Sequence, residues 1–155
     1  MSFDTKKFKT AKFSPRTEEV EVPELKEFFK EGKAVFVVRN LTGAEVGKVN
    51  ETGEKYKQFD AASKALAGDQ KEKITAFKVL FGISEGLTED TAKKTEAMMT
   101  GTVSPECDPE LAGLIRDRFP VVFTKITNKI YQLTGQGAMP GKPVGSGKKK
   151  KSKQA

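Results

Sequence analysis

The stretch that decides the fold reads DPELAGLIRDRFPVVFTKITNKIYQLTGQG and runs from Asp108 to Gly137. Its apolar residues recur every three or four positions, which places them on one stripe of a helix and not on alternating faces of a strand. The apolar positions are Leu111, Leu114, Ile115, Val122, Phe123, Ile126, Ile130 and Leu133. Such a stripe predicts a helical core, and the alternative is a face that meets a partner.

The ends of this stretch carry recognisable helix signals. Asp108 can cap the first free N–H groups, and Pro109 suits the first helical position because its missing N–H would be unpaired there. Gly135 is the expected end. Because Pro120 disfavours helical geometry at Phe119, we expect either two helices that meet at Pro120 or one helix kinked there.

The sequence before this stretch predicts a short β element. Residues 18–23 alternate polar and apolar side chains, and residues 34–38 form a compact, β-branched run. We expect an antiparallel pair with its first strand at an edge, since Pro23 cannot donate to a ladder. Two strands alone would be marginal, so they should pack on helices.

Three further helices are expected between the β element and Asp108. The first begins at Thr42 and Glu45, which form a capping-box pattern, and Gly53 suggests a break in it because glycine costs about 1 kcal/mol in a helix. The other two begin near Asp69 and Thr88. The glycines expected to end the three helices are Gly68, Gly82 and Gly101.

The net charge of +7 is concentrated at the two ends of the chain. Residues 1–16 carry five basic residues against one acidic residue, and residues 136–155 carry six lysines and no acid. Residues 17–135 hold 17 basic and 20 acidic residues, a net −3. We therefore expect a mobile basic arm over 1–16, one mainly helical domain over 17–135 with its β element at about 18–38, and a disordered, Lys-rich tail over 136–155.

The fold expected from these signals is mainly α: four or five short helices with a short N-terminal β-hairpin and disordered ends. The absence of histidine removes His-based acid–base catalysis, His-activated nucleophiles and nearly every zinc site. The sequence has no Gly-rich phosphate loop, and Cys107 is expected to be a structural thiol. We expect no enzyme activity, cofactor or metal.

The apolar and N-terminal patterns also bear on location. No run of about 18 apolar residues predicts a membrane span, and no signal peptide is apparent. A single cysteine is typical of a reducing cytoplasm.

Three segments of the chain form a pattern in a fixed order. The first is FVVRNLTGAE at 36–45, and the second is MMTGTVSP at 98–105 followed by DPEL at 108–111. The third is the Phe119–Pro120 pair, then Phe123, with LTGQG at 133–137. In their order and spacing these segments resemble the tail assembly chaperones of long-tailed bacteriophages, whose patterns include "VR-x-LTG-x-E" and "FP-x-x-F … I-x-x-LTGxG". The resemblance covers about residues 35–137, and the chain departs from it at Glu106 and Cys107, where an apolar residue would be expected.

The resemblance implies a protein without enzyme activity that works in the cytoplasm of the infected host. It would bind the tape measure protein, help to recruit the tail tube protein, and be absent from the mature virion. No membrane and no specific nucleic acid would be involved, while self-association remains open. The candidate partner-binding residues are Met98, Met99, Phe119, Val121, Val122 and Phe123.

One position in this set leads to a specific expectation. Four apolar residues flank or follow Pro120, which is too many for one helical stripe, so part of the cluster should face outward. Val121→Lys is expected to abolish tape measure binding while leaving the fold intact.

The lysine run near the C-terminus has two interpretations. It is either a solvated tail or the region of a programmed frameshift, which in this family yields a longer product. The extension would carry the tail tube contacts. The frameshift region would comprise Gly147, Lys148, Lys149, Lys150 and Lys151.

Two other functions compete with the chaperone hypothesis. A basic accessory protein could bind nucleic acid through both charged ends, and its affinity would collapse with salt. A structural component would be found in purified virions.

Overall fold

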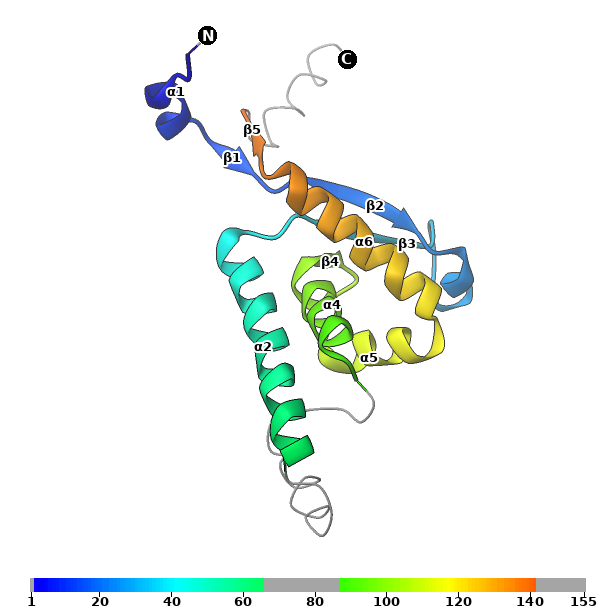
Figure 1. Ribbon diagram of the computed structural model, residues 1–155. Helices are drawn as coiled ribbons and strands as arrows, with labels where there is room; N and C mark the ends of the chain where they lie inside the picture. Colours follow the sequence, from blue (N-terminus) through cyan, green and yellow to red (C-terminus); the bar gives the residue numbers. More distant parts are fainter. Residues whose placement is uncertain (1, 66–86, 142–155) are drawn as a thin grey trace.

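The computed structural model describes residues 2–65 and 87–141, and its fold is mainly α with a small amount of sheet (Figure 1). The described helices are α1 (Thr5–Thr10), the 3-10 helix η1 (Pro23–Phe28), α2 (Gly43–Ala65), α4 (Glu89–Gly101), α5 (Pro109–Arg118) and α6 (Pro120–Gln136). The described strands are β1 (Phe13–Ser14), β2 (Thr17–Glu21), β3 (Val35–Arg39), β4 (Thr102–Ser104) and β5 (Met139–Pro140). The helix expected from Asp69 to Gly82 lies outside the described residues.

The strands form two antiparallel sheets. The larger sheet has the order β2-β3-β4, so β2 lies at an edge as Pro23 predicts. The expected pairing of the first two strands is confirmed, with Val20 opposite Phe36. The third strand, β4, pairs with β3 and was not expected from the sequence. It is only three residues long, too short to show a period in the sequence.

Helix α6 is the centre of the packing. It contacts β2 and β3 on one side and α4 and α5 on others, and Figure 1 shows it crossing the sheet diagonally. The predicted apolar stripe is confirmed as core along α6, whereas Leu114 of the same stripe, on α5, is 40% exposed. The buried residues of α6 are Val122, Phe123, Ile126, Thr127, Ile130 and Leu133.

The helix boundaries follow the local signals closely. Asp108 caps α5 by accepting a hydrogen bond from the Leu111 N–H at 2.8 Å, and α5 and α6 are separate helices that meet at Phe119 and Pro120. The expected end of α6 is wrong by two residues. Gly137, at φ +78°, ends the helix, because glycine adopts positive φ without a steric penalty.

Helix α2 is continuous, so the break suggested at Gly53 does not occur. A Cβ at this position would lie 2.5 Å from Cδ of Lys93 on α4. The glycine therefore allows α2 and α4 to approach closely, and this packing outweighs its poor helix propensity. At the end of α4, Gly101 permits a similar approach to Ile130 of α6.

The segment expected to be a mobile arm contains regular structure. Residues 5–10 form α1, and β1 pairs with β5, which places Phe13–Ser14 beside Met139–Pro140 (Figure 1). The rings of Phe3, Phe8 and Phe13 follow one another at centroid distances of 5.4 and 5.3 Å. Their five-residue spacing matches neither a helix nor a strand because they span a helix and the chain on either side of it. Residues 142–155, with the lysine run, lie outside the described residues.

Candidate functional site

Half of the predicted partner-binding residues lie in the core. Met98, Val122 and Phe123 are buried, so they are not available to a partner in this conformation. The physical reason is the same for all three: each lies on the face of its helix that packs against the rest of the domain. The expectation that these three form a partner surface is therefore corrected.

The other three predicted residues are at least partly accessible. Val121 is 74% exposed, in agreement with the expectation that part of the cluster at Pro120 faces outward. Met99 and Phe119 are partly buried against the core. Met99 lines a hollow between α2, α4 and α5, whereas Phe119 lines a different and more apolar groove.

This apolar groove has a volume of about 520 Å³ and lies between η1 and α5. Nine of the eleven lining residues that the structure describes are apolar, and none of these eleven is acidic. The lining residues are Leu25, Phe28, Phe29, Lys30, Phe36, Pro105, Leu111, Leu114, Ile115, Arg118 and Phe119. Contiguous exposed apolar surface of this kind is typical of sites that bind a partner or a ligand.

The groove is built on the core. Its buried lining residues are Leu25, Phe36 and Ile115, whereas Phe28 is 71% exposed and Leu114 is 40% exposed. Phe29 packs edge-on against Phe36 with ring centroids 6.4 Å apart. The exposed side chains thus rest on packed side chains, which fix the shape of the groove.

Two cations line the groove, Lys30 and Arg118. Within residues 2–65 and 87–141 neither side chain makes a hydrogen bond or an ion pair. Arg116, on the same helix as Arg118, differs because it contacts Asp117 at 3.0 Å. The groove is therefore apolar with unpaired positive charge beside it.

Phe28 is the most exposed of the apolar lining residues, and sequence reasoning missed it. It belongs to the Phe28–Phe29 pair just before Gly32, and two adjacent aromatic side chains of a short helix cannot both face the same core. This is a usable signal that one of them lies at the surface. Leu114 was placed on the apolar stripe correctly, but its exposure depends on where η1 packs, and the stripe alone does not reveal that.

A second cluster, which we call the polar junction, joins three segments, residues 36–45, 98–105 and 133–137. Arg39 of β3 donates two hydrogen bonds to the carboxylate of Glu45 and a third to the Thr100 carbonyl at 2.9 Å. The capping box is confirmed, since Glu45 accepts from the Thr42 N–H and Thr42 Oγ1 accepts from the Glu45 N–H. The pKa of Glu45 is lowered to about 2, first by its hydrogen bond with Arg39.

The polar junction extends to both ends of the domain. Leu41 donates its N–H to Oγ1 of Thr134 at 2.9 Å. Asn40 accepts from the Arg16 N–H at 2.7 Å, and Arg16 Nε donates to the Gly137 carbonyl. The side chains of Arg39, Asn40, Glu45 and Thr134 thus help to hold α2, β3 and the end of α6 together. Their role in the described structure is structural.

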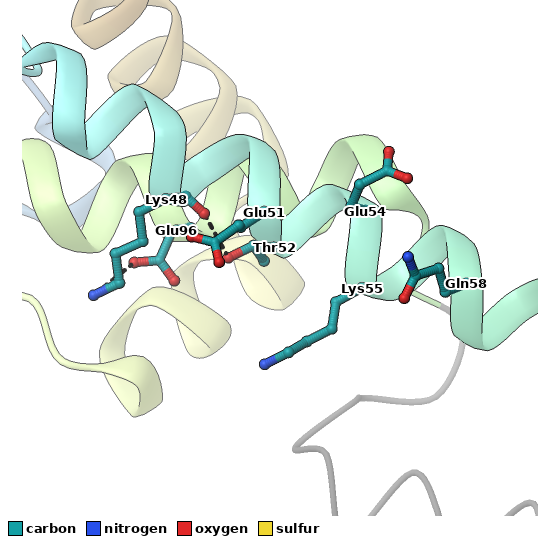
Figure 2. A pocket seen from close by; sticks show the side chains of 7 residues that line it. All are labelled: Lys48, Glu51, Thr52, Glu54, Lys55, Gln58 and Glu96. Atoms are coloured by element: carbon teal, nitrogen blue, oxygen red, sulfur yellow. Dashed lines mark hydrogen bonds and ion pairs between the residues drawn. The ribbon is translucent and has the colours of Figure 1, made fainter.

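Two further features of the described residues are a charged hollow and a buried cysteine. Figure 2 shows a charged hollow in which Glu96 comes from α4 and the other lining residues, including Lys48, come from α2. Among the described residues no three Cys, Asp or Glu side chains gather closely enough to hold a metal ion. Burial, with Asp108 nearby, raises the pKa of the Cys107 thiol to about 11, which keeps it protonated near pH 7.

Comparisons with protein-family models, with curated proteins and with solved structures find no match. Across the two described segments, no helix has both the length and the apolar content needed to cross a membrane.

Proposed function

We propose that this protein is a tail assembly chaperone of a long-tailed bacteriophage, which binds the tape measure protein in the host cytoplasm. The observation that carries the proposal is the open apolar groove between η1 and α5. A tape measure protein is long and helical, and its apolar stripes are exposed until the tail tube encloses it. An apolar groove can cover such a stripe by the helix-in-groove mode of recognition.

The polar junction gives a second, weaker support. Taken singly, each segment that resembles the chaperone family is a helix cap or a helix end. Arg39, Glu45 and Thr100 nevertheless meet, and Leu41 meets Thr134, so the segments act as one structural unit. A shared order of segments is more informative when the segments depend on one another.

The proposal also covers later steps of tail assembly. The chaperone would help to recruit tail tube protein through a longer, frameshifted product and would leave before the virion is complete. Mass spectrometry of the expressed locus tests this part. A single product ending at Ala155, with no larger species, would count against the frameshift.

The competing function, nucleic-acid binding, rests on the basic ends of the chain. Lys6, Lys7 and Lys9 lie on α1, at the opposite end of α6 from the groove (Figure 1). Binding that depends on neutralised phosphates falls by orders of magnitude between about 50 and 200 mM salt. Binding through an apolar groove should change little over that range.

Co-purification with the tape measure protein of the same phage tests the proposal. The two proteins are expressed together, one of them tagged, and recovered at 50 mM and at 200 mM NaCl. We expect a soluble complex at both salt concentrations and no copy of this chain in purified virions. Failure to recover the tape measure protein at either concentration would reject the proposal, and presence in virions would favour a structural role.

A further inference from the structure

We infer that the segment bound in the groove is an amphipathic helix whose apolar stripe is flanked by acidic side chains. This inference rests on the proposed function, because it describes the part of the tape measure protein that the chaperone would cover. It goes further by stating the charge pattern of that part. The argument uses the backbone of the groove, its apolar lining and its two cations.

The backbone around the groove favours a helix over a strand as occupant. Strand addition needs free backbone N–H and C=O groups along an edge. Here the walls come from η1 and α5, whose backbone groups bond largely within each helix, and from Pro105, which has no N–H. The groove therefore offers side-chain surface and no ladder, which suits the apolar face of a helix.

The exposed lining residues suit anchors spaced along one helical face. Phe28 projects from η1, Leu114 projects from α5, and both are substantially exposed above buried residues. Side chains at i, i+3 or i+4, and i+7 of a partner helix lie on one face and can pack between the two walls. Burial of this apolar surface would supply most of the affinity.

The two cations that line the groove favour acidic side chains on the bound helix. Lys30 follows η1 and Arg118 ends α5, so each wall of the groove carries one positive charge. A helix that fills the groove removes water from both cations, which is unfavourable unless each gains an anionic partner. Carboxylates beside the apolar stripe provide these partners, and lysines in the same places would be repelled.

Two designed helical peptides test the charge pattern directly. Both are 18 residues long and share the same leucine stripe, but glutamates flank the stripe in one and lysines flank it in the other. Their binding to the full chain is measured by fluorescence anisotropy at 150 mM salt, where the Debye length is about 8 Å and distant charges are screened. We expect the glutamate peptide to bind about tenfold more tightly.

Charge reversal on the protein provides the matched control. The double variant Lys30→Glu with Arg118→Glu should reverse the preference and favour the lysine peptide. The double variant Lys26→Glu with Lys33→Glu makes the same change in net charge at positions that do not line the groove. It should retain the wild-type preference. Thermal melts verify that all variants remain folded.

The outcomes separate the inference from the proposed function. Equal affinity for the two peptides, or no binding of either one, overturns the charge inference. So does a control variant that reverses the preference as strongly as the groove variant does. Titration of the wild-type chain with the tape measure protein is run in parallel, and absence of binding there rejects the proposed function whatever the peptides do.

Discussion

Arg39 binds Glu45 through two parallel hydrogen bonds, with Nη1 at 2.8 Å from Oε1 and Nη2 at 2.9 Å from Oε2. The same guanidinium donates to the carbonyl of Thr100, near the end of α4. The last residue of β3 thus fixes the start of α2 and the end of α4 together. Bidentate pairs of this kind hold a defined geometry because both partners are planar.

Glu45→Gln is expected to lower the free energy of unfolding by about 1–2 kcal/mol at pH 7. The pKa of Glu45 in the folded protein is about 2, below its ordinary value of 4.5. Its ionised form therefore stabilises the fold above about pH 4.5, and this contribution is lost as the pH falls from 4.5 towards 2. Urea unfolding at pH 7 and pH 3 should show a smaller difference between wild type and variant at pH 3.

The control for this prediction is Glu51→Gln on the same helix. Glu51 is exposed and lines the charged hollow of Figure 2. Its substitution should change the unfolding free energy by less than about 0.5 kcal/mol. Equal changes in unfolding free energy for the two substitutions would show that the ion pair between Arg39 and Glu45 does not stabilise the fold.

Gly101→Ala is expected to destabilise the protein by about 1–3 kcal/mol. A Cβ at Gly101 would lie 2.8 Å from Cγ2 of Ile130, and that side chain is buried and cannot move aside freely. Gly47→Ala is the matched control because a Cβ there meets nothing within 4 Å. It should stabilise α2 by up to about 1 kcal/mol. In thermal unfolding, a lower melting temperature for the Gly101 variant and an unchanged or higher one for the Gly47 variant would confirm the close approach of α4 and α6. A change of the same sign in both variants would contradict it.

Phe123→Ala should cost about 3–5 kcal/mol of unfolding free energy, because the side chain is buried in the core formed by α6. Phe28→Ala removes the same atoms from a side chain that is 71% exposed, so its cost should stay within about 0.5 kcal/mol. Chemical denaturation measures both. A melt of the Phe123 variant that matches wild type would place this residue outside the core.

Val121→Lys should leave the fold intact, since the side chain is 74% exposed at the start of α6. We still expect this variant to lose tape measure binding, which would extend the interface from the groove to the Pro120 junction. Val121 does not itself line the groove. Normal binding by a folded variant would exclude this position from the interface.

The local signals in the sequence predict most of the described helices. The cap at Asp108, the capping box at Thr42 and Glu45, and the cap at Thr88 each form the expected hydrogen bond. These interactions join residues three positions apart, so the sequence contains both partners side by side. The apolar stripe of α6 could also be predicted from the sequence, because its residues recur every three or four positions within one segment.

The features that sequence reasoning missed depend on contacts between distant segments. Strand β4 exists because β3 pairs with it, and Gly53 remains helical because α4 packs against it. The groove forms only when η1 and α5 lie beside each other, although about eighty residues separate them in the chain. Met98 and Phe123 were named as candidate partner-binding residues for a related reason. The spacing of apolar residues shows that they share a helical face, but it does not show whether that face packs in the core or meets a partner.

The most direct test of the central claim compares Phe28→Lys with Phe3→Lys. Both phenylalanines are 71% exposed, but Phe28 lines the groove and Phe3 precedes α1 at the other end of α6. Isothermal titration with the tape measure protein should show at least a tenfold loss of affinity for the Phe28 variant, as expected when a central anchor is removed, and wild-type affinity for the Phe3 variant. Wild-type affinity for a folded Phe28 variant would contradict the claim that this groove binds the tape measure protein.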